Sequence, residues 1–556
     1  MTRTGLDTAA VGSSVDMPDP DIILAQADPY GAFSRPDEVG VAVSTLHEGR
    51  ALRVDVGALR GVTRVVLRWH RRIVGDTLVL GDAWERSYGD LQWQTMRPER
   101  PLPWTFLVHE RSANSTWGAG VEVRGGALAF WTVDPHGFSL WLDVRSGDAP
   151  VEPGDRSIHA ATVHAVFGTE RPYAVQCQLA SLMCSDPLLP EAPVAGANNF
   201  YYAYGKGFDA AAVVRDARII SELAGHHPVR PFGVVDDGWS ADGTADGHPS
   251  SSGPWNRPRT PQFGLMSELA DAVRAEGARP GIWYRPLLTK SPPAEGLRRA
   301  VDGAYSLDIT HPRSLRTVAE DIARLVGWGF ELVKHDFSTW DMFGRWGSAM
   351  GASVTGRSWQ PANEPYAGSS WAPYDRSMTN AEAIVRFYRT IRESAGDALI
   401  IGCNVIGHLA AGLTHVQRIG DDTSGLVWER TRRVGVNTLA FRLAQHGRLF
   451  VADADCVPST HHTGWEKNRQ FLDLVARSGT ALFVSVDPST RTSQVDEDLA
   501  RALKLALDGG APGGVEPIDW LHTTTPERWR SGGQELVYDW LDPAGADPFE
   551  WAENNR

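Results

Sequence analysis

Cysteine and long apolar runs are scarce in this chain, and each scarcity excludes a class of protein. Only four of the 556 residues are cysteines, and they form neither a disulfide framework nor a CxxC metal pattern. No run of about 18 apolar residues is present, so no transmembrane helix is predicted. The N-terminal stretch also lacks the apolar segment of a signal peptide. We therefore expect a cytoplasmic protein without a membrane partner.

Basic residues are outnumbered by acidic ones, 54 against 68. The formal net charge is -14, and binding to phosphate backbones needs a basic surface, so nucleic acid is not expected as a partner. Tryptophan, in contrast, is abundant, with 21 residues. Indole faces suit the C–H faces of sugar rings, although tryptophan is also simply a large core residue. The oligomeric state stays open, and a homo-oligomer is one of the states allowed.

Residues 29–192 form short runs in which apolar and polar residues alternate between Gly, Pro and Asp turns, as in "ALRVDVGAL" and "VTRVVLRWHR". This pattern predicts an antiparallel β-sandwich, and we see no convincing helical stripe in it. Residues 1–28 are expected to be a flexible N-terminus. The tryptophans expected in the sandwich core are Trp69, Trp104, Trp117, Trp131 and Trp141.

In residues 193–510, extended runs alternate with helical ones, beginning with "FYYAYG" as the first strand. Roughly eight strands over roughly 300 residues predict a (β/α)8 TIM barrel. A doubly wound open sheet is the alternative, but no Gly-rich phosphate loop follows the first strand. Residues 511–556 are expected to form a short C-terminal β appendage, which makes the protein multidomain.

Several predicted barrel strands end in carboxylates. These residues are Asp236, Asp237, Asp336, Asp421, Asp422, Asp453 and Asp455. A single aspartate at such a place is usually a helix cap or a turn residue, but several on one rim would repel one another. They need cations, a ligand or a metal, and Lys334 and Arg418 could supply the cations. A Ca²⁺ or Mg²⁺ site is less favoured because no EF-hand loop or HExxH motif is present. His461 and His462 are expected to be loop residues.

Lys334 and Asp336 are two residues apart on the strand predicted over "FELVKHDF" and therefore lie on one face. Two carboxylates at the ends of different strands suit glycosidic bond cleavage. One carboxylate attacks the anomeric carbon, while the other protonates the leaving oxygen and then activates water. A lysine beside the attacking carboxylate would keep it ionised and could also bind a sugar hydroxyl.

These residues resemble glycoside hydrolase family 36, the α-galactosidase and raffinose synthase group, and its relative family 27. The motifs that carry the resemblance are "GDAWERSYGDLQW" (81–93), "VVDDGW" (234–239), "LVKHDF" (332–337), "RIGDDTS" (418–424) and "ADADCV" (452–457). The order of sandwich and barrel also matches. The fifth-strand segment "IGCNVIG" departs from the family pattern because it lacks the Gly-rich continuation common in its bacterial α-galactosidases.

The resemblance implies Asp336 as nucleophile. It also implies Asp422 as acid/base, because the family's arginine precedes that residue by four positions. The substrate-binding residues that it implies or that we expect are Asp236 and Asp237 on the 4- and 6-hydroxyls, Trp239 as an aromatic wall, Lys334 on a neighbouring hydroxyl, Arg418 near the 2-hydroxyl, and Cys403 with Asn404 on the sugar's C2 side. No cofactor and no metal are implied.

The sequence therefore predicts a retaining exo-α-glycosidase, first of all an α-galactosidase, that acts on a carbohydrate substrate by double displacement. One alternative is a raffinose synthase-like α-galactosyl transglycosylase that uses the same residues. Another is a non-catalytic carbohydrate-binding protein on a degenerate barrel, against which the intact pair of Asp336 and Asp422 argues.

Overall fold

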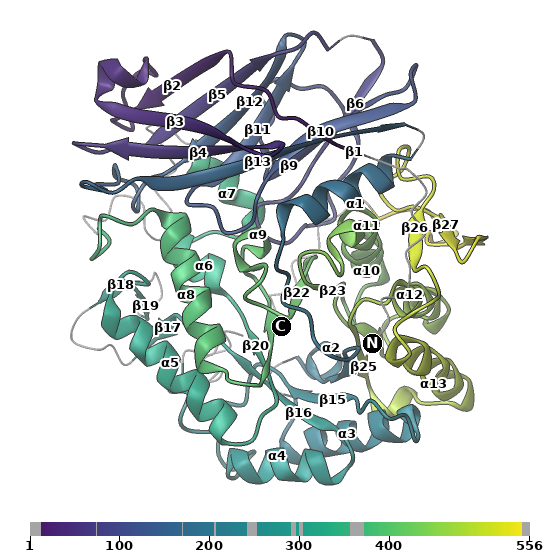
Figure 1. Cartoon of the computed structure of the whole chain (residues 1–556). Coiled ribbons are helices and arrows are strands. Elements are labelled where there is room, and N and C mark those ends of the chain that lie inside the picture. Colours follow the sequence, from purple (N-terminus) through teal and green to yellow (C-terminus); the bar gives the residue numbers. More distant parts are fainter. Residues whose placement is uncertain are drawn as a thin grey trace.

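The computed structural model describes residues 13–73, 75–169, 171–204, 207–241, 253–290, 296–299, 304–355 and 372–547. Two antiparallel sheets lie on one side of the molecule, and a parallel sheet surrounded by helices lies on the other (Figure 1). This arrangement agrees with the predicted order of a sandwich followed by a barrel.

The sandwich consists of two sheets whose inner faces pack together. The first contains β1 (Ser13–Val15), β3 (Val41–Glu48), β4 (Ala51–Ala58), β6 (Thr77–Gly81), β7 (Gln94–Thr95), β9 (Thr105–Glu110), β10 (Ser115–Val121) and β13 (Ile158–Thr169). The second contains β2 (Ile22–Gln26), β5 (Arg64–His70), β8 (Leu102–Pro103), β11 (Leu128–Asp134) and β12 (Gly137–Asp143). Phe106 and Trp131 meet between them with ring centroids 5.1 Å apart. Of the tryptophans expected in this core, only Trp141 is half-buried rather than buried.

Two features of this domain differ from what we predicted. The segment expected to be a flexible N-terminus contains two paired strands, because β1 pairs with β13 and β2 pairs with β5. The chain also forms a helix that we did not predict, α1 (Pro172–Met183). Its buried residues Val175, Leu179 and Met183 are four apart and make one apolar stripe against the sandwich. The stripe is short, and it follows a long series of strands that hides it.

The second domain has a parallel sheet that curls like a TIM barrel. Its order is β23 (Val451–Asp453), β22 (Val416–Arg418), β21 (Leu399–Gly402), β20 (Leu332–His335), β16 (Arg279–Tyr284), β15 (Phe232–Val235), β14 (Ala195–Asn198), β25 (Leu482–Val486) and β24 (Val457–Ser459). A bridge between Asp453 of β23 and Ala481, the residue directly before β25, connects one end of this order with the strand next to the other end. Counted along the chain, β20 is the fourth strand of this sheet and β22 the sixth among the described residues.

The first strand of this sheet is not the predicted "FYYAYG", most of which forms α2 (Phe200–Ala203). The strand lies just before it, in the small residues of β14. Aromatic residues favour strands and small residues do not, so the β-propensity of single residues indicated the wrong segment. Residues 195–198 form the first strand because β14 pairs with both β15 and β25.

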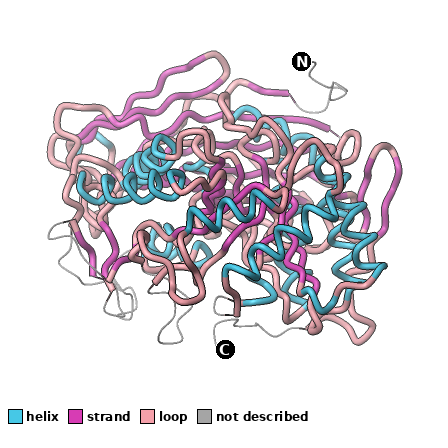
Figure 2. Tube along the Cα trace, turned by 90° about the horizontal axis from the view of Figure 1, so that it is seen from below, coloured by secondary structure: helices cyan, strands magenta, loops and turns pink. Residues whose placement is uncertain are grey.

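Helices lie around the parallel strands (Figure 2). They are α3 (Ala210–Ala224), α4 (Met266–Ala275), α5 (Pro312–Gly327), α6 (Ser338–Phe343), α7 (Met350–Thr355), α8 (Asn380–Ser394), α9 (Gly407–Ala410), α10 (Trp428–Thr431), α11 (Asn437–Arg442), α12 (Trp465–Ser478) and α13 (Ser493–Leu507). Helix α8 begins at a capping box in which Thr379 and Glu382 satisfy each other's backbone N–H groups. Within the described ranges, no helix has the length and apolarity needed to span a bilayer.

Two small antiparallel sheets complete the fold. One contains β17 (Leu288–Thr289), β18 (Leu297–Arg299) and β19 (Tyr305–Leu307), and the other contains β26 (Val515–Pro517), β27 (Arg528–Ser531) and β28 (Gln534–Val537). The second of these lies within the segment predicted as a C-terminal β appendage.

The inner core of the curled sheet can be tested through Leu332, which is fully buried in a cluster with Val234, Ile401 and Val416. Truncation there removes apolar contacts and leaves a cavity. Leu332→Ala should therefore lower the free energy of unfolding by about 2–5 kcal/mol, measured by urea denaturation. The control is Leu265→Ala, at a side chain that is 65% exposed, which should change little.

Candidate active site

Alternate residues along the parallel strands change from apolar to polar toward the carboxyl ends. On β15, Val234 is followed two residues later by Asp236, and on β20, Leu332 is followed by Lys334 and Asp336. Residues two apart share one face of a strand, and the apolar members of these series form one buried cluster. The polar side chains therefore lie directly beyond an apolar plug, at the end where barrel sites are built.

Asp336 is held by three donors. Its Oδ1 accepts hydrogen bonds from Asn404 Nδ2 at 2.5 Å and from the backbone N–H of Phe337 at 2.6 Å. Its Oδ2 accepts from Trp283 Nε1 at 3.0 Å. Phe337 and Asn404 both have a positive φ, of 60° and 46°. Such backbone strain in non-glycine residues clusters at functional sites, and here it flanks one carboxylate.

Lys334 pairs with Asp236 and not with Asp336 as the sequence predicted. Its Nζ donates to Asp236 Oδ2 at 2.7 Å, and Asn198 Nδ2 donates to the same oxygen at 2.5 Å. Burial alone would lower the pKa of Lys334, but the Asp236 carboxylate raises it well above its ordinary value, with a smaller contribution from Asp336. The lysine is thus a fixed ammonium beside the second-strand aspartates. Asp237 follows directly and is only 4% exposed.

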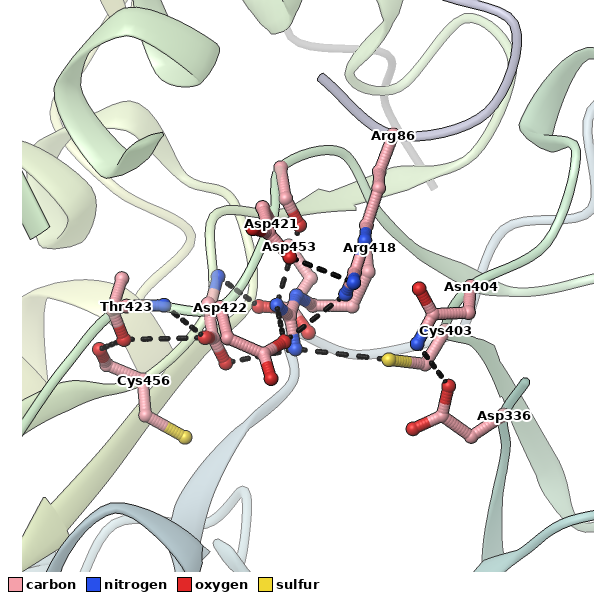
Figure 3. A network of polar contacts seen from close by, with 12 residues as sticks. Arg86, Asp336, Cys403, Asn404, Arg418, Asp421, Asp422, Thr423, Asp453 and Cys456 are labelled. Carbon is pink, nitrogen blue, oxygen red and sulfur yellow. Dashed lines mark hydrogen bonds and ion pairs between the residues drawn. The ribbon is translucent and has the colours of Figure 1, made fainter. Parts of the chain in front are cut away.

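Arg418 joins two other carboxylates at the end of β22 (Figure 3). Its Nη2 lies 2.9 Å from Asp422 Oδ1, and its Nη1 lies 2.9 Å from Asp455 Oδ1. Asp455 also accepts from the hydroxyl of Tyr201 and from the backbone N–H of Thr423. The guanidinium is 1% exposed, so it is part of the foundation of the site and not an open binding group.

A second arginine, from the sandwich domain, reaches Asp422 and its neighbour Asp421. Arg86 Nη2 lies 2.7 Å from Asp421 Oδ1, and Arg86 Nη1 lies 3.0 Å from Asp422 Oδ1. Arg430 also pairs with Asp421, at 2.7 Å. Burial opposes ionisation of Asp422, but the charges of Arg86 and Arg418 outweigh it and lower the pKa of that carboxyl far below its ordinary value.

Asp453, at the end of β23, has the opposite surroundings. It is 4% exposed, and its Oδ1 accepts the backbone N–H of Asp455 at 2.8 Å. Burial raises the pKa of Asp453 to about 6, although the charge of Arg418 acts in the other direction. The rim therefore holds carboxyl groups of unequal acidity, which is how sites separate acid and base roles.

Three side chains for which we predicted a contact with a sugar are engaged within the protein. Trp239 is fully buried, packs against Trp255 and Trp328, and donates its Nε1–H to the backbone oxygen of Trp283 at 2.8 Å. It therefore offers no free face to a ring and instead supports Trp283. Arg418 is occupied by carboxylates, as described above. Cys403 is 1% exposed, with its thiol 3.7 Å from Arg418 Nη1, so it too lies beneath the site.

The structure adds residues that the sequence did not assign. Trp283 donates to Asp336, and Asn198 donates to Asp236. Arg86 lies in the motif at 81–93, but no local signal there shows that it reaches carboxylates more than 300 positions later. The predicted residues Asp236, Asp336, Asn404 and Asp422 do lie at the carboxyl end of the parallel sheet.

The raised pKa of Asp453 predicts a pH effect on stability. The folded state holds this proton up to about pH 6, whereas the unfolded chain loses it near pH 4, so stability falls as pH rises between these values. The difference of about two pKa units corresponds to roughly 3 kcal/mol. Asp453→Asn should remove this loss, so its stability relative to the parent should increase from pH 4 to pH 7 in urea denaturation. Asp148→Asn, at a side chain 91% exposed, is the control and should show no such trend.

Comparison with known proteins supports the fold. No protein-family model and no curated protein sequence matches this chain. Among solved structures, the α-galactosidase TtGalA of Thermus thermophilus, in complex with p-nitrophenyl α-D-galactopyranoside, is 17% identical with a TM-score of 0.56. The match covers 89% of this chain and 99% of that one.

Two GH36 α-galactosidases of Geobacillus stearothermophilus are also similar. AgaA is 15% identical with a TM-score of 0.58, over 85% of this chain and 68% of that one. AgaB is 16% identical with a TM-score of 0.57, over 89% of this chain and 72% of that one. At these identities the similarity shows that the chain has the same fold as these enzymes.

Proposed function

We propose that the protein is a retaining exo-α-glycosidase of glycoside hydrolase family 36, with α-galactosides as its substrates, built on a (β/α)8 barrel. The observation that carries this proposal is the pair of carboxylates at the ends of β20 and β22. Asp336 is fixed by neutral hydrogen-bond donors, whereas Asp422 is bound by arginines. Two carboxylates in different surroundings suit the two roles in glycosidic cleavage.

In the first step, Asp336 attacks the anomeric carbon while the bond from that carbon to the leaving oxygen breaks. The attacking oxygen is proposed to be Oδ2, because it is the less engaged of the two oxygens. Among the described residues, Oδ2 accepts one hydrogen bond, from Trp283, whereas Oδ1 accepts two, from Phe337 and Asn404. Asp422 gives its proton to the leaving oxygen. The product is a glycosyl ester on Asp336 and an alcohol that departs.

In the second step, Asp422 acts as the base. It removes a proton from water, and the water oxygen attacks the anomeric carbon and releases the Asp336 carboxylate. Two inversions give net retention. The aspartate has then recovered the proton that it gave away in the first step.

Binding of the sugar falls to the end of β15. Asp236 is neutralised by Lys334, so it can accept a hydroxyl without an unpaired buried charge. Asp237 stands beside it, and together they are proposed to hold the 4- and 6-hydroxyls. Solved structures with this fold include α-galactosidase complexes with a nitrophenyl galactoside and with stachyose, which supports galactose as the sugar.

The two carboxylate roles can be separated by substitution. Asp336→Ala should be inactive on every substrate, because no covalent route is left. Asp422→Ala should lose far more activity on an oligosaccharide than on an aryl glycoside, whose phenolate leaves without a proton. Azide, which needs no base, should then release the glycosyl group as an α-glycosyl azide. These rates and products are measured with nitrophenyl α-galactoside and raffinose.

Asp421→Ala is the matched control, since Asp421 shares Arg86 with its neighbour but neither gives nor takes a proton in the proposed reaction. Its leaving-group dependence should be far smaller than that of Asp422→Ala, and it should give no azide product. Azide rescue of the Asp421 variant alone would mean that the two roles must be exchanged. Absence of hydrolysis by the parent protein across nitrophenyl α-glycosides would contradict the enzyme assignment.

Asp237 tests the choice of sugar. A charged acceptor that meets a hydroxyl contributes roughly 1.5–3 kcal/mol, so Asp237→Ala should lower kcat/KM for the galactoside by about 10- to 150-fold. The panel should include the α-glucoside, the N-acetyl-α-galactosaminide and the β-L-arabinopyranoside. If galactoside hydrolysis were unchanged, galactose would not be the sugar that this site recognises.

A further inference from the structure

The proposed acid/base residue poses an electrostatic problem. A general acid must carry a proton, yet Asp422 Oδ1 lies 3.0 Å from one guanidinium and 2.9 Å from another. Both arginines favour the ionised form and keep the pKa of Asp422 low, although its partial burial acts in the opposite direction. If Asp422 acts as the acid, at least one of these contacts must open during the reaction. The following inference rests on the proposed function.

The two contacts differ in how easily they can open. Arg418 is 1% exposed, pairs with Asp455 at 2.9 Å, and donates to the backbone oxygen of Gly420 at 3.2 Å. Its position is therefore fixed from several sides. Arg86 divides its guanidinium between Asp421, at 2.7 Å, and Asp422, at 3.0 Å. Loss of Asp422 would leave Arg86 paired with Asp421, so no buried charge would be stranded.

The backbone supports this division. Ser87, next to Arg86, donates its N–H to Ile419 at 2.9 Å, and its carbonyl accepts the N–H of Asp421 at 2.8 Å. The Ser87 hydroxyl lies 2.6 Å from the hydroxyl of Thr438. Arg86 and Asp421 are thus held together across the boundary between the two domains.

Exposure identifies the group that can move. The side chain of Asp422 is 30% exposed, against 14% for Asp421 and 5% for Arg86. Asp422 is therefore the member of the trio that can turn toward a ligand while the other two stay in place.

We propose that Arg86 is a positioning residue of the sandwich domain that holds the Asp422 carboxylate and releases it to the glycosidic oxygen, while itself staying bound to Asp421. Asp422 takes up a proton from solvent as it leaves Arg86 and passes it to the leaving oxygen. Through Arg86, the sandwich domain thereby controls the step at which Asp422 of the second domain can take up and transfer its proton.

Several other groups also face Asp422, and none of them is changed in the test below. They are Arg418 on β22, Arg430 on α10, Lys334 on β20 and Tyr201 on α2. Because they stay constant, a difference between the parent and an Arg86 variant reports the contribution of Arg86.

The test is the pH profile of kcat/KM for melibiose, whose leaving group needs a proton. The basic limb of this profile reports the acid in the free enzyme. Arg86→Met should move that limb to higher pH by about one pH unit or more, since a neighbouring arginine lowers the pKa of a carboxyl group by about that amount. Arg86→Lys, which keeps the charge, should move it less. A dinitrophenyl α-galactoside, whose leaving group departs unaided, should show no such shift.

A second variant tests the sharing, and its single substitution leaves Arg86 unchanged. Asp421→Asn leaves Arg86 with Asp422 as its only carboxylate partner among these three residues, so the basic limb should move downward. Part of that movement could come directly from the lost charge of Asp421. In the double variant with Arg86→Met, the Asp421→Asn substitution should therefore shift the limb less than it does in the parent.

The outcomes are distinguishable. A basic limb that stays in place in Arg86→Met and in Asp421→Asn, in proteins that hydrolyse galactosides and melt like the parent, would overturn this inference alone. If Asp421→Asn shifted the basic limb equally in the parent and in the Arg86→Met background, Arg86 would not be shared between Asp421 and Asp422 in the way that the inference requires. A parent protein that hydrolyses no α-glycoside would overturn the proposed function and this inference with it.

Discussion

The pairing of Arg418 with Asp422 and Asp455 is the interaction on which the rest of the candidate site depends. Carboxylates crowded at the end of a barrel, where water is scarce, cost several kcal/mol each unless a cation meets them. Arg418 is 1% exposed and pairs with both at 2.9 Å. Because it rises from β22 directly above Val416 of the apolar plug, the position of its charge is set by the strand itself.

The same need for compensating charge joins the two domains. The loop after β6 brings Arg86 to Asp421 and Asp422, and Asp82 of that loop pairs with Arg442 of α11 at 2.8 Å. Arg442 also donates to the backbone oxygens of Glu85 and Ile419. The sandwich is therefore part of the site's electrostatics, because without it two carboxylates of the barrel would lose a cationic partner.

The sequence predicted those parts of the fold and site that follow from local periodicity. Alternation along strands gave the sandwich, and the spacing of Lys334 and Asp336 placed both on one face of β20. The residues with which these charged side chains pair could not be predicted from periodicity. Lys334 binds Asp236, which is 98 positions away, and Arg86 binds Asp422, which is 336 positions away. Such pairs depend on the packing of whole elements, and so does the fact that Trp283, and not Trp239, donates to Asp336.

The two halves of the site are held by different kinds of contact, and this difference fits their proposed tasks. Around Asp336, Phe337 and Asn404 are held in left-handed backbone conformations, a strain that persists only where surrounding contacts fix it. A nucleophile must approach one atom along one line, so a rigid setting lowers the cost of reaching that geometry. Asp422 is more exposed and is held by charge, which acts at a distance and tolerates small movements. A group that gives a proton in one step and takes one in the next needs that freedom, because its partner changes from a sugar oxygen to water.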